Sequence, residues 1–305
     1  MKKMIKHTVF FLVVIATLSP VLGQAFNPAA HVYIAGKVAR QVFPFTFDKV
    51  NLYYGSIAPD ISSYAALEHW PYGFCETHYR FTKLPYAWWN PIQKAFAQGW
   101  QIHSEIGPWG ADYYAHGTCS YLAPSPCSLG SCNYDGYVPT QATVLAEALK
   151  ASGNDLLIEN PDLAHFAIEV AVDILLVDNK DHTLGEKLLS AALFRSSEDV
   201  KLLAKVFVER SDDAGTDWGT LSSAESTFRN LVINYATALT LCDPLRMALL
   251  GEIGVQVASA LGVKIDSATV QLIVEAAINQ CREDYYGPVS NAINGIIINK
   301  SKLIK

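Results

Sequence analysis

The segment Leu163–Val177 is apolar except for His165, Glu169 and Asp173, which are spaced four residues apart. Residues at this spacing lie above one another on one face of a helix. The preceding pair, Asn160-Pro161, is typical of the first positions of a helix. We therefore predict a helix that is buried on nearly all sides and carries one stripe of imidazole and carboxylate groups.

This stripe constrains what surrounds the helix, because burying an unpaired carboxylate is costly. A metal ion would compensate Glu169 and Asp173, and the ligand types are suitable for one. A His–Glu hydrogen bond buried between helices is the purely structural alternative, since perturbed polar clusters also occur in structural networks. The rest of the chain has to decide between the two.

The N-terminus has the pattern of a secretory signal. Lysines stand at positions 2, 3 and 6, an apolar stretch covers 9–18, and small residues follow at Gly23 and Ala25. The stretch is too short for an ordinary membrane anchor. We predict a signal at 1–25 and a mature protein that is soluble and secreted or periplasmic. An uncleaved N-terminal anchor is the alternative, and cleavage after Gly23 or after Ala25 fits equally.

The charge balance excludes one class of function. The formal net charge is −6, and removing the three lysines of residues 1–25, which include no acidic residue, lowers it to −9. A general binder of phosphate backbones needs a basic surface, so we expect no stable nucleic-acid binding. A metal-dependent phosphoesterase remains possible, because the metal supplies the positive charge.

The cysteine count favours disulfides, since six cysteines in an exported chain form an even set. Cys119, Cys127 and Cys132 predict a stapled loop, and Cys242 and Cys281 could bridge two helices. The connectivity stays open. No pair has the two-residue gap typical of a thiolate zinc site, so we set that site aside.

Helical patterns dominate the chain, and we predict an all-α fold. Asn-Pro pairs at 27–28 and 90–91 indicate helix starts. The predicted helices are 28–41, 91–106, 112–116, 140–152, 161–178, 184–194, 197–209, 222–241, 244–262, 267–281 and 288–299. We assign residues 26–182 to a catalytic domain and 183–305 to a helical C-terminal extension. The reason is that the residues that could ligate a metal concentrate before residue 182.

The histidines show this asymmetry. Those of the mature chain are His31, His69, His78, His103, His116, His165 and His182. We interpret His69 and His182 as structural or surface residues. Asp112 and His116 are four apart, like His165 and Glu169, and two such pairs on different helices can converge in a bundle core. Neutral imidazole and carboxylate are suitable zinc ligands.

Six short segments occur in an order that resembles the zinc-dependent phospholipase C family. That family includes the catalytic part of glycosylphosphatidylinositol phospholipase D and is related to the single-strand-specific zinc nucleases. The segments are Asn27-Pro28-Ala29-Ala30-His31, Gly55-Ser56-Ile57-Ala58-Pro59-Asp60, Thr77-His78-Tyr79, Gly99-Trp100-Gln101-Ile102-His103, Asp112-Tyr113-Tyr114-Ala115-His116 and His165-Phe166-Ala167-Ile168-Glu169. The resemblance covers roughly residues 26–182 and rests on the order and spacing of the segments together.

The resemblance implies an all-helical domain that holds three zinc ions. The ligand sets it implies are Asp60, His78, His103 and Asp112; His116, His165 and Glu169; and His31, Asp112 and the mature N-terminus. Cleavage after Ala25 would make Phe26 the N-terminal ligand, whereas cleavage after Gly23 would weaken this assignment.

One departure from the family pattern concerns His103 and Asp112, which are nine residues apart rather than four. At ~100° per residue, nine residues place them on opposite faces of an unbroken helix. Gly107-Pro108 must therefore break the helix, or Glu105 replaces His103. We prefer His103. Asp173 lies outside the family pattern and is either a support for a ligating histidine or a salt-bridge partner.

The implied reaction is hydrolysis of a phosphodiester by metal-activated water, with Asp60 as the general base. We expect a phospholipid substrate of the phospholipase C type and transient contact with a membrane surface. A single-strand nuclease, a glycosylphosphatidylinositol-cleaving enzyme and a non-catalytic metal-containing binding protein are the alternatives. Aromatic residues near the motifs could hold a quaternary ammonium or a nucleobase, although ordinary packing explains most of them. They are Trp70, Trp88, Trp89, Trp100, Trp109, Tyr113 and Tyr114.

Overall fold

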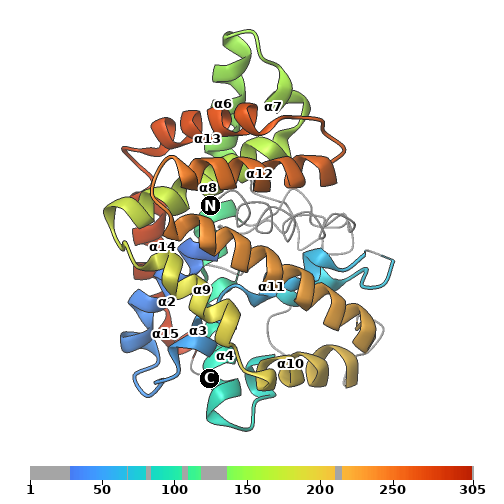
Figure 1. The fold of residues 1–305 in the computed structure, drawn as a ribbon. Helices are drawn as coiled ribbons and strands as arrows, with labels where there is room; N and C mark the ends of the chain where they lie inside the picture. Colours follow the sequence, from blue (N-terminus) through green and yellow to red (C-terminus); the bar gives the residue numbers. More distant parts are fainter. Residues whose placement is uncertain are drawn as a thin grey trace, which may run out of the picture.

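The computed structural model describes residues 28–66, 68–79, 84–104, 109–117, 136–209 and 215–303. Within these ranges the chain is helical and contains no strand, which confirms the predicted all-α class (Figure 1). Several predictions concern residues outside these ranges: the signal and its cleavage sites, the ligand Phe26, Glu105, the Gly107-Pro108 break, and the loop cysteines Cys119, Cys127 and Cys132.

The described residues form α-helices joined by short 3-10 and π-helical turns. The elements are α2 (Pro28–Val42), α3 (Lys49–Gly55), η1 (Ala58–Tyr64), η2 (Cys75–Tyr79), η3 (Leu84–Tyr86), α4 (Pro91–His103), α5 (Ala111–His116), α6 (Tyr137–Ala151), α7 (Leu156–Glu159), α8 (Pro161–Asn179), α9 (Leu184–Phe194), α10 (Ser197–Ala204), η6 (Lys205–Glu209), α11 (Trp218–Thr240), α12 (Leu245–Ala260), α13 (Ser267–Cys281), α14 (Tyr286–Ile298) and α15 (Lys300–Leu303). Every predicted helix has a counterpart, while the short elements α3, η1, η2, η3, α7 and α15 have no predicted equivalent.

Helix starts follow the predicted capping chemistry in part. The side chain of Asn90 accepts a hydrogen bond from the backbone N–H of Gln93, as expected of an N-cap residue. Asn160 precedes α8 but its side chain does not cap the helix; its amide instead donates to the carbonyl of Leu156. This helix start is therefore explained by Pro161 at the first helical position.

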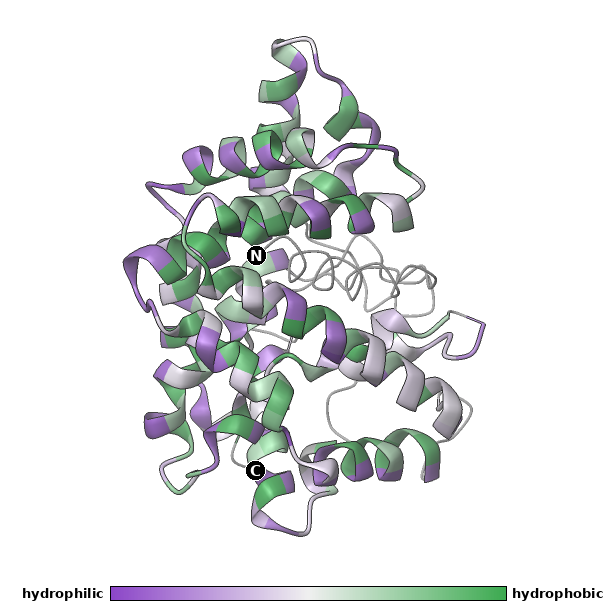
Figure 2. Cartoon of the chain, in the orientation of Figure 1, coloured by the Kyte–Doolittle hydropathy of each residue, from purple (hydrophilic) through white to green (hydrophobic). Residues whose placement is uncertain are grey.

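Helix α8 has the predicted burial. Its residues between Leu163 and Val177 are buried, apart from the partly buried Phe166. Helices α6 and α13 pack against it, and α2 also contacts it. Figure 2 shows that other helices carry green and purple residues side by side, as amphipathic helices do. Burial on all sides makes α8 a rigid support for the polar side chains that it carries.

The hydrophobic core is continuous from Ala29 on α2 to Leu303 at the end of α15. After residue 182 the chain returns repeatedly to the earlier elements: α9 contacts α2 and α3, α11 contacts η1, and α14 contacts both α2 and α5. The later helices thus cover the elements that carry the histidines. The division at residue 182 stays a prediction.

Two glycines set how closely α3 and α4 approach. A Cβ atom on Gly55 would lie 2.1 Å from the carbonyl oxygen of Phe96, and one on Gly99 would lie 2.0 Å from that of Leu52. Both distances are far inside van der Waals contact, so the crossing requires the absence of a side chain at these positions. It brings the end of α4 against the start of η1.

The cysteines among the described residues are Cys75, Cys242 and Cys281. Cys242 and Cys281 are free thiols, so the bridge considered between them is wrong; Cys75 is disulfide-bonded.

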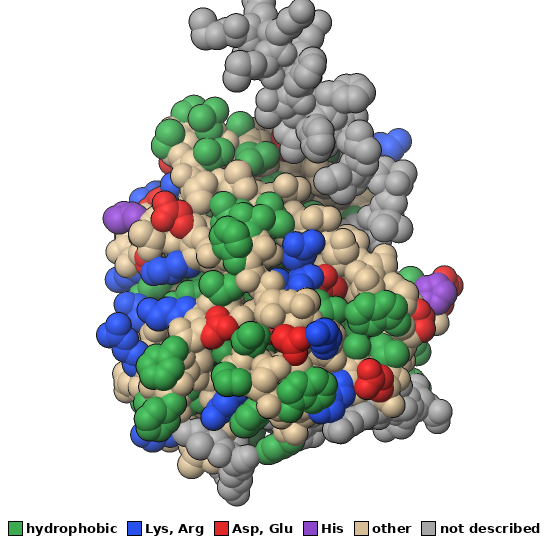
Figure 3. All heavy atoms as spheres, turned by 60° about the horizontal axis from the view of Figure 1, so that its bottom comes forward, with side chains coloured by type: hydrophobic (Ala, Val, Ile, Leu, Met, Phe, Trp, Pro, Cys, Tyr) green, Lys and Arg blue, Asp and Glu red, His purple; other side chains and the backbone are tan. Residues whose placement is uncertain are grey.

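In Figure 3, positive and negative side chains stand between hydrophobic ones on the face turned forward. None of the helices in the described ranges has the length and apolarity needed to cross a bilayer.

Candidate metal centre

Imidazole and carboxylate side chains from between residues 31 and 169 come together in three groups. The groups are His31, His103 and Asp112; Asp60, His78 and His103; and His116, His165 and Glu169. In each group the ligand-type atoms lie within 4.8 Å of one another, and every member is buried. These groups could hold metal ions, and they contain all the predicted ligands that belong to the described residues.

The group of His116, His165 and Glu169 forms a small triangle. Its Nε2–Nε2 edge measures 3.1 Å, and Oε1 of Glu169 lies 3.2 Å from His116 Nε2 and 3.0 Å from His165 Nε2. Ligands at zinc–ligand distances of 2.0–2.2 Å in a tetrahedral site lie roughly 3.3–3.6 Å apart. The observed edges are only slightly shorter, so one ion would fit after a small outward shift of the ligands.

The second triangle joins residues from three elements: Asp60 on η1, His78 on the π-helical turn η2, and His103 at the end of α4. The Nε2 atoms of His78 and His103 are 3.3 Å apart, and Oδ1 of Asp60 lies 3.3 Å and 3.6 Å from them. All three edges are close to those of a tetrahedral zinc site.

Each histidine of this triangle is oriented through its other ring nitrogen. Nδ1 of His103 lies 2.9 Å from the carbonyl oxygen of Ser56, to which it donates, and Nδ1 of His78 lies 2.8 Å from the hydroxyl of Thr77. Such outer contacts fix ring orientation and leave Nε2 to face a metal. The close crossing at Gly99 makes the first contact possible, because His103 is one turn further along α4.

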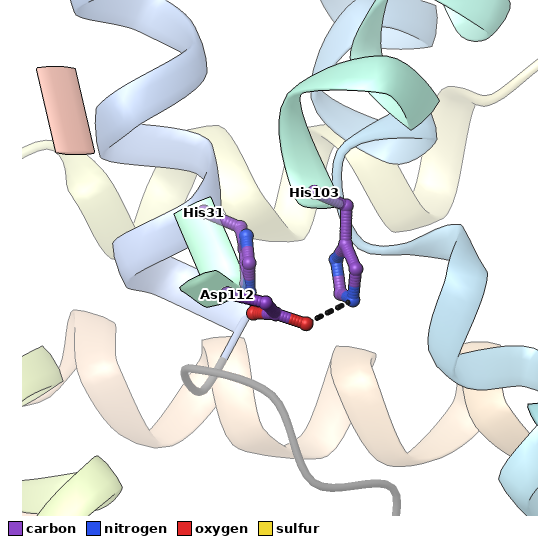
Figure 4. Close-up of side chains that lie close together, drawn as sticks. All are labelled: His31, His103 and Asp112. Carbon is purple, nitrogen blue, oxygen red and sulfur yellow. Dashed lines mark ion pairs between the residues drawn. The ribbon is translucent and has the colours of Figure 1, made fainter. Parts of the chain in front are cut away.

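Asp112 belongs to the remaining group, with His31 and His103, and that group shares His103 with the triangle of Asp60 and His78. Figure 4 shows its carboxylate below the rings of His31 and His103, which stack with centroids 4.2 Å apart. Oδ1 lies 3.0 Å from His31 Nε2, and Oδ2 lies 2.9 Å from His103 Nε2. Two oxygens facing two separate histidines are the arrangement of a carboxylate that bridges two ions.

Helix α4 ends at His103 and α5 begins at Ala111, so the side chains of His103 and Asp112 belong to separate helices and can face each other. Glu105 and Gly107-Pro108 lie outside the described residues, so the preference for His103 over Glu105 stays a prediction.

The pKa values of these side chains depend on their burial and on their contacts with one another. Burial raises the pKa of Glu169 well above its ordinary value, and the carboxylates of Asp60 and Asp112 add to the rise. For Asp112, burial acts in the same direction, but His103 and His31 outweigh it and hold the pKa well below the ordinary value. Buried carboxyl groups that lie close together repel each other when ionised, so bound cations would stabilise their charged forms.

The histidines divide into neutral and charged members. Burial lowers the pKa of His116 to about 4 and that of His165 well below its ordinary value, so both present neutral imidazoles. Burial also opposes the charge on His103, but Asp112 and Asp60 raise its pKa to about 9. A cation would replace that proton, since a ligating imidazole is neutral.

One side of the centre reaches solvent. Asp60, His165 and Glu169 retain 6%, 4% and 4% of their exposure, whereas the other members retain 1% or less. Tyr64, four residues after Asp60, is partly buried; burial and then the charges of Asp60 and Glu169 raise its pKa, so the phenol keeps its proton.

The aromatic residues separate into core and surface. Trp70 and Trp100 are buried in the core, which confirms ordinary packing for them. Trp88 and Trp89 are exposed, with lysines over their rings. Half-buried aromatic residues flank Asp112 in sequence: Trp109, Tyr113 and Tyr114.

Some supporting groups were not predicted. The carbonyl of Ser56 carries no sequence signal as a partner of His103, whereas Thr77 could have been suspected from its place beside His78. The exposure of His69 and His182 agrees with their interpretation as surface residues. A comparison of this chain with protein-family models, curated proteins and solved structures finds no match.

Proposed function

We propose that this protein is a zinc-dependent phosphodiesterase of the phospholipase C type, with three zinc ions held by the groups described above. The observation that carries the proposal is the linkage of the groups: His103 belongs to two of them, and Asp112 faces both His31 and His103. Linked sites would hold neighbouring ions, which is the arrangement that clamps a phosphate diester.

The donor set supports zinc over other common metals. Each group combines imidazole nitrogen with carboxylate oxygen and contains no thiolate. Calcium and magnesium prefer all-oxygen sites, whereas zinc is bound by histidine and carboxylate in tetrahedral geometry. A third ligand set would be completed by the mature N-terminus, for which Phe26 is the proposed residue.

Bound zinc ions would supply positive charge for phosphate oxygens and lower the pKa of bound water. Asp60 lies on the solvent-reaching side, and its contacts with His78 and His103 both use Oδ1. Its Oδ2 can therefore orient a water molecule and accept its proton, the general-base role proposed for it. Tyr64, which keeps its proton, would donate a hydrogen bond to the substrate.

Phospholipid is the proposed substrate because the chain is acidic overall, with a formal net charge of −6. A long polyanion such as single-stranded DNA would be repelled, whereas a zwitterionic head group would not. Tyr113 and Tyr114 follow Asp112 directly and are half-buried, and we propose that their rings contact a quaternary ammonium. Transient contact with a membrane surface, and export after cleavage of a signal, belong to the same proposal.

A substrate panel tests the proposal. Mature, zinc-loaded protein should cleave phosphatidylcholine and a chromogenic phosphorylcholine ester, and it should be inactive after chelation. Preferential cleavage of single-stranded DNA would support the related nuclease, and that of a glycosylphosphatidylinositol anchor the anchor-cleaving enzyme. Full metal content with no cleavage of any phosphodiester would overturn the enzyme proposal and leave a metal-containing binding protein.

A further inference from the structure

We infer that Asp173 is a positioning residue of the metal centre, which fixes the first turn of α2 and thereby places His31. The inference rests on the proposed metal centre, but it concerns a residue outside the three candidate groups. Asp173 is fully buried and lies on α8, far in sequence from the helix that it would hold.

The contacts of Asp173 are direct and use both carboxylate oxygens. The backbone N–H of Ala30 donates to Oδ1 at 2.7 Å, and that of Ala29 donates to Oδ2 at 3.0 Å. The hydroxyl of Tyr235, on α11, donates to Oδ2 at 3.0 Å. Three donors therefore converge on one buried carboxylate, which explains why it is tolerated in the core.

These contacts perform the task of a helix cap from a distance. The first N–H groups of a helix have no partner inside the helix, and a side chain just before it usually accepts them. In α2 the first residue is Pro28, which has no N–H, and Asp173 accepts those of the next two residues. The start of α2 is thus tied to α8.

This tie joins the candidate metal groups. His31 directly follows Ala30, whose N–H makes the shorter bond to Asp173. On α8, Asp173 lies one turn beyond Glu169, which lies one turn beyond His165. One rigid helix therefore supplies two members of one group and holds the backbone that bears a member of another. The spacing between these groups is set by α8.

The test compares three variants of the mature protein by metal binding rather than by activity. In Asp173→Asn, the amide nitrogen must face either the N–H of Ala29 or that of Ala30, because each carboxylate oxygen accepts one of them. Tyr235→Phe removes one donor and keeps both backbone bonds. Asp266→Asn is the matched control, since Asp266 caps α13 by accepting from the N–H of Thr269 at 2.7 Å.

Zinc content is measured after equilibration with chelator-buffered zinc, and cobalt substitution reports the ligand field of each site. We expect Asp173→Asn to weaken one ion out of three by roughly 10–100-fold, the usual effect of losing an outer support. Tyr235→Phe should weaken the same ion by about fivefold, the effect of one hydrogen bond. Asp266→Asn should bind like the parent protein.

The outcomes are separable. If the parent protein binds three ions and both test variants match it in affinity and cobalt spectrum, the role of Asp173 is overturned while the metal centre stands. If the parent binds no zinc, the metal centre itself fails and this inference with it. If Asp173→Asn does not fold, Tyr235→Phe decides: a selective loss at one ion supports the inference, and unchanged binding overturns it.

Discussion

Nε2 of His103 lies 2.9 Å from Oδ2 of Asp112, although nine residues separate them and α4 ends at His103. This contact lies within one candidate metal group, and His103 also belongs to a second group. It exists because the chain leaves one helix and enters another between the two residues. The position of His103 in turn depends on how closely α4 approaches α3. The first prediction concerns that approach.

Replacing Gly99 by alanine should weaken metal binding, although Gly99 is not a member of any candidate metal group. The new Cβ would lie 2.0 Å from the carbonyl oxygen of Leu52, so α3 and α4 must separate and move His103 away from Ser56. We expect a loss of about 1–3 kcal/mol in the free energy of unfolding and weaker metal binding, measured by denaturant titration and zinc content. Gly287→Ala on α14, where nothing lies within 4 Å, is the control and should be neutral or stabilising. Equal behaviour of the two variants would contradict this explanation.

Glu169→Gln should remove one ion. The variant keeps the shape of the side chain but loses the charged oxygen that faces His116 and His165. Elemental analysis should show one zinc fewer, and phosphodiesterase activity should fall at least about tenfold. The control is Glu159→Gln on the exposed surface of α7. Normal zinc content in Glu169→Gln would remove that residue from the ligand set.

Chelation should destabilise the whole protein, because the buried carboxylates lose their counter-ions. A ligand present at 100 times its Kd stabilises the folded state by about 2.7 kcal/mol per site. With several sites, we expect the Tm to fall by more than about 10 °C in chelator and to recover when zinc is restored. Magnesium should not restore it, because the sites are rich in nitrogen. An unchanged Tm would mean that the groups are satisfied without metal.

Asp199, remote from the metal groups, should make stability depend on pH. It lies in the first turn of α10, its carboxylate has no hydrogen-bond partner among the described residues, and burial raises its pKa to about 9 despite the opposing charge of Arg195. The folded protein thus binds this proton more tightly than the unfolded chain. Stability from this group is complete below about pH 4 and falls as pH rises towards 9.

Asp199→Asn removes that dependence. At pH 8 the variant should be more stable than the parent by roughly 1 kcal/mol or more, and at pH 4 the difference should be small. Denaturant titrations across the pH range measure it, with the exposed Asp155→Asn as the control. A difference that stays constant with pH, or grows towards acid, would contradict the assignment.

The local features of the fold could be predicted from sequence, since they depend on nearby residues. The apolar run with His165 and Glu169 four apart predicted α8 and its polar stripe, and Asn90-Pro91 predicted the start of α4. Helix α3 was missed because its seven residues are too few for a periodic pattern. The predicted end of α4, Ile106, lies three residues beyond the observed end at His103.

The assembly of the centre could be expected only from the order of the motifs. Periodicity places Asp112 and His116 on one face, but it does not bring Asp60 to His78 or His31 to Asp112, which are tertiary contacts. The tie between Asp173 and the start of α2 spans 144 residues and had no sequence signal. From the sequence, Asp173 is the third member of a stripe and is either a support for a ligating histidine or a salt-bridge partner, with no partner residue identified.

Our central prediction is that these side chains surround metal ions. The most direct test is an anomalous difference map at the zinc absorption edge, from crystals of the mature protein grown with zinc. The account predicts three peaks: one between Asp60, His78 and His103, one between His116, His165 and Glu169, and one beside His31, with Asp112 shared between the first and the last. A map without peaks at these side chains, from crystals that show their ordered density, would contradict it.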